Sequence, residues 1–181
     1  MKWKTISSKY IVKKPWATLR VDNCELPDGR IANEYYVLEY PNWANAVAIT
    51  DDGKMIMVRQ YRHSGDIISL EIPGGVIEEN EEPVKAIERE LLEETGYAFD
   101  KFELVSTVYP NPATSNNVCY CYLATGGKKI QDQQLDDNED ISVELFSIEA
   151  IKEMLLKNEI SQALHTTGLF YAFLKLGTIN I

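Results

Sequence analysis

The segment from Pro83 to Gly96 most constrains the fold, because it places a helix between two groups of β-prone segments. Pro83 suits the first position of a helix and Gly96 suits the residue just beyond its end, which predicts a helix over Pro83–Thr95. At roughly 100° per residue, three apolar side chains share the stripe expected to face the core: Val84, Ile87 and Leu91. A helix between groups of strands indicates a mixed β-sheet covered by helices, in the α+β class.

The β-prone segments contain β-branched and aromatic residues, and Asp28-Gly29 is a hairpin turn signal. The first forty residues are expected to be β structure as a whole. Strands are predicted before the helix over residues 16–26, 31–40, 45–50, 54–62 and 68–75, and after it over residues 102–110, 116–126 and 141–147. The remainder, from about residue 148 to 176, is predicted to be helical with an interruption near "HTTG".

The composition argues against several classes of function. The 181 residues are 45% hydrophobic and 25% charged, as in ordinary globular domains, and the net charge is −10. No basic footprint stands out, so we do not expect binding to a nucleic acid polymer. No run approaches the length of a membrane span, and the N-terminus lacks the apolar region of a secretory signal, so no membrane association is expected.

The cysteines and histidines also point away from disulfide and zinc chemistry. Cys24, Cys119 and Cys121 are interpreted as reduced thiols of the core, which is typical of a cytoplasmic protein. The two histidines, His63 and His165, are too few and too far apart in the sequence to predict a zinc site.

Three carboxylates gather on the predicted helix: Glu90, Glu93 and Glu94 share a face beside the apolar stripe. A run of glutamates on a helix is most often a solvated face. The other interpretation is a site for a hard cation with oxygen ligands, Mg²⁺ or Mn²⁺. The preceding stretch "EIPGG" favours this second interpretation, since adjacent glycines allow close approach of the backbone to a ligand. Arg89 can also hold a carboxylate such as Glu81 in a fixed fork.

The spacing of residues in this region resembles the Nudix box. The matching positions are Gly75, Glu81, Arg89, Glu90, Leu91, Glu93, Glu94, Gly96 and Tyr97. The resemblance implies the Nudix fold, an α/β/α sandwich with a mixed central β-sheet, and metal-dependent hydrolysis of a nucleoside diphosphate linked to another group. By position it implies that Glu90, Glu94 and the Gly74 carbonyl bind Mg²⁺ or Mn²⁺. Glu93 would be a further ligand or would position water.

The same resemblance assigns structural roles to the other polar and glycine positions of the box. Arg89 and Glu81 would fix the glycine-rich loop against the helix. Gly75 and Gly96 would likewise be structural residues of the box and would take no part in the chemistry.

Three stretches outside the box resemble the ADP-ribose and nucleotide-sugar pyrophosphatase branch of this family. By position in "RQYR", Arg62 would contact substrate phosphate, and in "EIPGG" Glu71 would lie near the metal site. In "DDNEDISVELFS", Glu139 would be an acid on the metal side, and Asp137 falls where the branch has a glutamate acting as general base. Because aspartate is one methylene shorter, the general base stays open between Asp137, Glu139 and Glu93. A solvated turn is the alternative for this acidic loop.

The branch implies ADP-ribose or a related ADP-sugar as substrate and AMP plus a sugar phosphate as products. Many members have an acidic residue near the end of the loop "PNPATSNN", where this chain has Asn116 and Asn117. Asn117 is therefore a candidate for substrate binding, and GDP-mannose or another nucleotide sugar remains an alternative substrate. A non-catalytic sensor of a nucleotide metabolite is an alternative of another class, although this chain keeps every acid of the box.

The branch also implies two parts and a homodimer. Residues 1–40 would form an antiparallel β extension that packs across the dimer and helps to build the pocket for the base, and residues 41–181 would form the hydrolase domain. Trp16 is the first candidate for stacking on the base, ahead of Trp3 and Trp43, since an aromatic face can hold any base. An ordinary core or interface tryptophan is the alternative for each.

Overall fold

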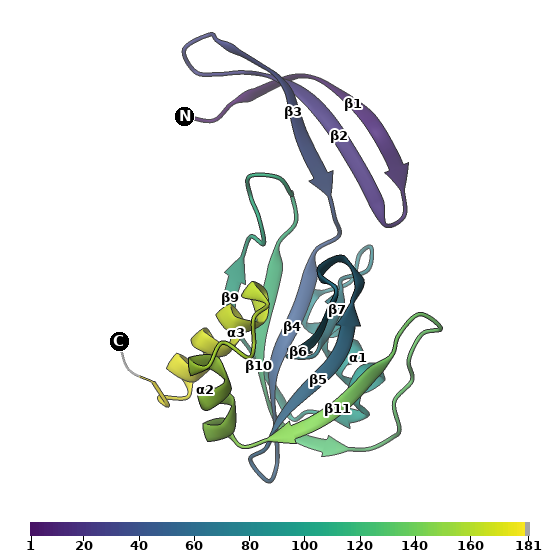
Figure 1. Cartoon of the computed structure of the whole chain (residues 1–181), viewed down its shortest axis with the longest axis vertical. Helices are drawn as coiled ribbons and strands as arrows, with labels where there is room; N and C mark the ends of the chain where they lie inside the picture. The colour runs from purple at the N-terminus through teal and green to yellow at the C-terminus, as the bar shows by residue number, and fades with distance from the viewer. Residues whose placement is uncertain (180–181) are drawn as a thin grey trace. The chain divides into compact units, whose positions relative to one another are not determined.

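The chain consists of two compact units in the computed structural model, which describes residues 1–179 (Figure 1). The first unit contains Met1–Pro41 and Tyr109–Val118, and the second contains Asn42–Val108 and the rest of the chain from Cys119. The division expected from the sequence, between residues 40 and 41, did not assign the loop at residues 109–118 to the first unit.

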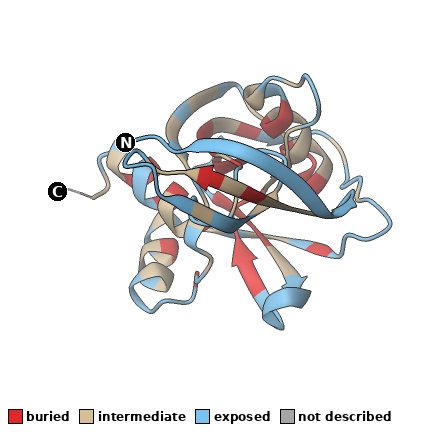
Figure 2. Cartoon of the chain, turned by 90° about the horizontal axis from the view of Figure 1, so that it is seen from above, coloured by how far each residue is buried: buried red, intermediate tan, exposed pale blue. Residues whose placement is uncertain are grey.

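The first unit is built on a three-stranded antiparallel sheet in the order β1-β2-β3. Its strands are β1 Lys4–Lys14, β2 Ala17–Glu25 and β3 Ile31–Glu39. Asp28 and Gly29 lie in the turn between β2 and β3, where Gly29 has a φ of 85°, so the predicted hairpin is confirmed. β1 is exposed along its whole length (Figure 2). It was not delimited as a strand in the sequence.

The second unit contains an eight-stranded mixed sheet with β11-β5-β4-β10-β8 as its main path. In addition, β6 pairs with β5, β7 with β4 and β9 with β10. The strands are β4 Trp43–Thr50, β5 Met55–Arg62, β6 Ile67–Glu71, β7 Gly74–Val76, β8 Tyr97–Ala98, β9 Lys101–Val108, β10 Cys119–Lys129 and β11 Ile141–Phe146. β4 and β10 run parallel and the other pairs are antiparallel, which makes the sheet mixed.

The first helix of this unit, α1, spans Pro83–Thr95, as predicted, and ends at Gly96 in the left-handed conformation. Two further helices, α2 Ile148–Leu156 and α3 Ala163–Lys175, follow the last strand. A short 3-10 helix spans His63–Gly65.

The interruption predicted near "HTTG" is wrong, because these residues lie inside α3 and the chain breaks instead between α2 and α3, over residues 157–162. Tertiary packing explains the difference: a Cβ added at Gly168 would lie 2.6 Å from the sulfur of Cys121, so a glycine inside the helix allows it to approach the sheet. Gln162 starts α3 by accepting the backbone N–H groups of Leu164 and His165 on its side-chain oxygen.

Helices cover both faces of the mixed sheet, which confirms the α/β/α sandwich. On β4, Val47 and Ile49 contact the cluster that contains residues of α2 and α3. Ala46 and Ala48 of the same strand belong to the opposite cluster, with residues of α1. This alternation follows from the period of two along a strand, and it explains why β4 is apolar almost throughout.

The buried thiols and the helices bear on two expectations. Cys24, Cys119 and Cys121 are all free and buried, which confirms their interpretation as core thiols. Over residues 1–179, none of the helices combines the length and the apolar character that crossing a membrane requires.

Candidate active site

The carboxylates of α1 meet the backbone at the start of β7. The Glu94 carboxylate is 4% exposed, and its Oε2 accepts a hydrogen bond from the backbone N–H of Gly74 at 2.9 Å. A Cβ added at Gly75 would lie 2.5 Å from the carboxyl carbon of Glu90. The absence of a side chain at Gly75 therefore lets the backbone come this close to the acidic face of the helix.

Arg89 holds the glycine-rich loop against α1. Its guanidinium forms a two-point ion pair with Glu81, at 3.0 and 3.1 Å, and also donates to the carbonyl of Val76 at 3.1 Å. The same Nη1 donates to Glu90 and Glu93, each at 3.0 Å. One arginine thus connects three carboxylates and the loop backbone, which is the arrangement that the planar fork of arginine favours.

A hollow of about 470 Å³ lies beside these carboxylates, and we call it the acidic hollow. Its lining residues are Glu78, Arg89, Glu90, Glu93, Gln134, Leu135, Asp136 and Glu139. Glu139 reaches it from the loop before β11, where its carboxylate accepts the backbone N–H of Asp136 at 3.0 Å. Asp137, in the same loop, is exposed and does not line the hollow. The structure therefore brings Glu139 together with the carboxylates of the box, whereas Asp137 stays outside.

Burial and repulsion between the carboxylates raise the pKa of two of them, Glu94 and Glu90. Burial raises the pKa of the Glu94 carboxyl to about 8, and the negative charges of Glu90 and Glu139 add to the effect. Burial likewise raises the pKa of Glu90, with Arg89 opposing the rise and Glu93 and Glu139 adding to it. Glu94 is thus a buried acid next to other acids, and within residues 1–179 it forms no ion pair of its own.

These residues fit a hard divalent cation by their chemistry. Over residues 1–179, no three His, Cys, Asp or Glu side chains are grouped closely enough to hold a metal ion as they stand, and Arg89 contacts two of the candidates instead. The candidate ligand atoms are nevertheless carboxylate oxygens, and among the described residues the buried Glu94 carboxylate accepts a hydrogen bond only from the backbone N–H of Gly74. Such a donor set suits Mg²⁺ or Mn²⁺.

A second charged group lies on β5 and β6. Arg62 donates to Glu71 through Nε at 3.0 Å and through Nη2 at 2.5 Å, and His165 contacts the same carboxylate through Nε2 at 3.1 Å. Glu71 is 1% exposed. Burial acts to raise the pKa of the Glu71 carboxyl. The hydrogen bonds from His165 and Arg62 outweigh burial and hold this pKa below its ordinary value. The sequence indicated Arg62 and Glu71 but gave no signal for His165.

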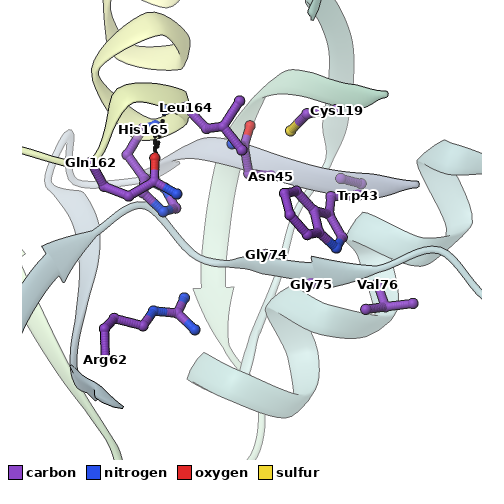
Figure 3. Close-up of a pocket in the computed structure, with 11 residues that line it drawn as sticks. Trp43, Asn45, Arg62, Gly74, Gly75, Val76, Cys119, Gln162, Leu164 and His165 are labelled. Carbon is purple, nitrogen blue, oxygen red and sulfur yellow. Dashed lines mark hydrogen bonds between the residues drawn. The ribbon is translucent and has the colours of Figure 1, made fainter. Parts of the chain in front are cut away.

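Arg62 and His165 line a cavity of about 270 Å³, which we call the α3 cavity (Figure 3). Its lining residues are Trp43, Ala44, Asn45, Arg62, Gly74, Gly75, Val76, Cys119, Gln162, Leu164 and His165. The guanidinium end of Arg62 points in towards the other lining residues (Figure 3). Asn45, Gln162 and Leu164 were not anticipated, because they come from β4 and the start of α3, which only the fold brings together.

The substrate candidates of the first unit have contrasting environments. Trp16 lies in the turn between β1 and β2 and is 82% exposed. Asn117 is buried, and neither its side-chain nitrogen nor its oxygen has a hydrogen-bond partner within residues 1–179. Asn116 instead accepts the backbone N–H of Tyr40 at 3.1 Å. Of the two asparagines, Asn117 thus has the side chain with unused hydrogen-bonding groups.

Comparison with known families and proteins agrees with this geometry. A model of the NUDIX domain matches residues 40–166, and a model of the nucleoside diphosphate sugar hydrolase N-terminal domain matches residues 3–38. A solved structure described as that of an ADP compounds hydrolase superposes with a TM-score of 0.85 over 98% of this chain and 96% of that one. At 18% identity this likeness shows the fold.

Two curated relatives are similar over most of their lengths. An ADP-ribose pyrophosphatase of Bacillus subtilis (strain 168) is 31% identical over 173 residues, which are 95% of this chain and 93% of that protein. A methanol dehydrogenase activator of Bacillus methanolicus is 33% identical over 151 residues, 82% of this chain and 81% of that protein. With the family model matching most of the sequence, the chain belongs to the Nudix family and is a Nudix hydrolase.

Proposed function

We propose that this protein is a metal-dependent pyrophosphatase that hydrolyses ADP-ribose or a related ADP-sugar to AMP and a sugar phosphate. The observation that carries this proposal is the buried carboxylate of Glu94 beside Glu90 and Glu139, against the Gly74–Gly75 backbone. Relatives named ADP-ribose pyrophosphatase, from Bacillus subtilis and from Mycobacterium tuberculosis at 28% identity, favour this substrate class.

Glu90, Glu94 and the Gly74 carbonyl would hold Mg²⁺ or Mn²⁺, with Glu93 and Glu139 as further ligands. When bound, the metal orients the phosphate oxygens, promotes ionisation of the attacking water and stabilises the charge on the leaving phosphate. The residues of the chain bring the reacting groups together and exclude bulk water on the helix side, where Glu94 and Leu91 are buried.

In the proposed reaction, a water oxygen forms a bond to one phosphorus of the diphosphate while the bond from that phosphorus to the bridging oxygen breaks. A carboxylate of the chain accepts the proton of the water. Glu139 is favoured over Asp137 for this role because its side chain lines the acidic hollow. Glu93, on α1, lines the same hollow and is the other candidate.

Arg62 would bind substrate phosphate, with Glu71 holding its guanidinium in place through the two-point ion pair. Trp16 and Asn117, in the first unit, are proposed to contribute to the pocket for the nucleotide, in a homodimer whose interface involves residues 1–40. The exposed aromatic ring of Trp16 and the unpartnered amide of Asn117 support these two roles. A cytoplasmic location is proposed from the three free, buried cysteines.

The test is release of phosphate in a coupled phosphatase assay, with purified protein, Mg²⁺ or Mn²⁺ and a panel of substrates. The panel contains ADP-ribose, ADP-glucose, GDP-mannose, UDP-glucose, NADH and the nucleoside triphosphates. We expect preference for ADP-ribose or ADP-glucose. Preference for GDP-mannose would keep the chemistry and replace the substrate. Tight binding of one compound without turnover of any would instead support the non-catalytic sensor and contradict the proposal.

A further inference from the structure

We propose that His165, at the start of α3, is a positioning residue that fixes the phosphate-binding orientation of Arg62 by way of Glu71. This inference rests on the proposed function for the role of Arg62. It assigns a role in substrate binding to a residue of the C-terminal helix, which lies more than ninety positions after Glu71 in the sequence.

The Glu71 carboxylate lies between His165 and Arg62 and contacts both side chains. Glu71 accepts Arg62 on both carboxylate oxygens, and its Oε2 also accepts His165 Nε2 at 3.1 Å. The only further donor to this carboxylate within residues 1–179 is Gln60, at 3.4 Å. Since a carboxylate with a lowered pKa is an acceptor, the imidazole donates from Nε2. The 3.1 Å contact with Glu71 is the one polar contact of the imidazole among the described residues, because Nδ1 is buried without a partner.

The imidazole is itself held by a rigid element. His165 is 7% exposed, and its backbone N–H donates to the capping side chain of Gln162. One and two turns further along α3, Leu169 and Phe173 are buried in the core. The buried ring therefore lies where it can restrict the rotation of Glu71.

The ion pair with Glu71 leaves part of the arginine free for substrate. Nε and Nη2 of Arg62 donate to Glu71, whereas Nη1 has no hydrogen-bond partner within residues 1–179. Arg62 lines the α3 cavity together with the Gly74–Gly75 backbone, which contacts the acidic face of α1 on its other side. Because two nitrogens of Arg62 are held by Glu71, its remaining N–H groups point in one direction. A guanidinium oriented in this way loses little rotational freedom when it binds a phosphate oxygen.

Three variants separate this role from simple packing. His165→Phe keeps a ring without a donor, and His165→Asn keeps an amide that is too short to reach Glu71. His165→Gln places an amide nitrogen near the position of Nε2. For ADP-ribose with saturating Mg²⁺ we expect Phe and Asn to raise KM about tenfold and to change kcat less than about twofold. We expect Gln to keep KM within about twofold of the wild type.

A double-mutant cycle supplies a readout that a packing role would not move. In an Arg62→Lys background, which lacks the fork, His165→Asn should produce no further increase in KM. Additive effects of the two substitutions would overturn the proposal. So would an unchanged KM in folded Phe and Asn variants, or an equal rise in all three. If Phe and Asn unfold while Gln folds, as judged by circular dichroism, His165 is a structural residue and the proposal is wrong.

A binding measurement keeps this proposal distinct from the proposed function. If the wild type hydrolyses none of the nucleotide sugars, the proposed function fails, and calorimetry with inorganic pyrophosphate still tests the orientation of Arg62. The expected result is that His165→Asn weakens pyrophosphate binding about tenfold and His165→Gln does not. Equal binding by the wild type and His165→Asn would contradict the role of His165 even where the hydrolase activity is present.

Discussion

The acidic hollow and the α3 cavity differ in the residues that line them and in the segments that supply those residues. The hollow is lined by four glutamates, an aspartate and Arg89 from α1 and from short loops. The cavity is lined by a tryptophan, several apolar side chains and Arg62, which come from β4, β5, β10 and α3 among other segments. The hollow suits a cation and charged oxygens, whereas the mixed lining of the cavity suits an organic ring with polar groups.

Two buried glutamates illustrate the difference. Glu94 is next to other acids and has its pKa raised to about 8, chiefly by burial. Glu71 is equally buried, but hydrogen bonds from His165 and Arg62 outweigh burial and lower its pKa. The ionised form of Glu71 is therefore stabilised within the protein, whereas burial and neighbouring acids favour the protonated form of Glu94. Burial alone therefore does not decide the state of a glutamate, because the charged groups around the carboxylate set the direction of its pKa shift.

The largest expected effect concerns Glu94. Glu94→Gln should leave the fold intact and lower kcat about 10³-fold, because a metal ligand that contributes several kcal/mol of charge stabilisation is lost. Steady-state rates on ADP-ribose measure this, with circular dichroism to verify folding. Glu88→Gln is the matched control, since Glu88 is on the same helix and pairs with Lys85 away from the hollow.

Near wild-type turnover by a folded Glu94→Gln protein would remove Glu94 from the metal site. A loss of similar size in Glu88→Gln would show that the helix, and not the individual carboxylate, is sensitive to substitution. Either outcome would contradict the different roles proposed for Glu94 and Glu71.

A smaller effect is expected in the loop before β11. Glu139→Gln should lower kcat about 10²-fold, in the range of a general base, because its carboxylate lines the acidic hollow. Asp137→Asn serves as its matched partner and should lower kcat less than about threefold, since Asp137 is exposed and outside the hollow. The pair of kcat values decides the assignment, and a larger loss for Asp137→Asn would transfer the role to Asp137.

The smallest expected effect is on stability. Arg89→Lys replaces the fork that holds Glu81 and the Val76 carbonyl, and should lower the free energy of unfolding by about 2 kcal/mol. Urea denaturation of the metal-free protein measures it. Arg59→Lys is the control, because the ion pair of Arg59 with Glu144 is more exposed and should contribute less than about 1 kcal/mol. Equal losses in the two variants would show that Arg89 is an ordinary surface residue.

The ends of some elements could be predicted, because a proline or a glycine at a given position favours one local structure. Pro83 and Gly96 mark both ends of α1, and Asp28-Gly29 marks the β2–β3 turn. The position of the break between the C-terminal helices could not be predicted, because Gly168 packs closely against Cys121, forty-seven positions earlier, and only the fold brings the two together. The loop at residues 109–118 could not be assigned to the first unit either, since that depends on contacts such as Tyr35 with Ala113.

The residues of the candidate site also differ in whether the sequence could predict them. The residues of the box are close in sequence, so their spacing alone placed Glu90, Glu93 and Glu94 on one face and paired Arg89 with Glu81. Asp136 and His165 gave no sequence signal, because an aspartate in an acidic loop and one histidine on a helix are both common in solvated or core positions.

Metal-dependent hydrolysis is tested by the release of AMP from ADP-ribose by the wild-type protein, before and after metal removal with EDTA and after Mg²⁺ is restored. We expect AMP release that disappears with EDTA and returns with Mg²⁺. AMP release that is unchanged in excess EDTA, or no AMP in Mg²⁺ or Mn²⁺ from any nucleotide sugar, would contradict it.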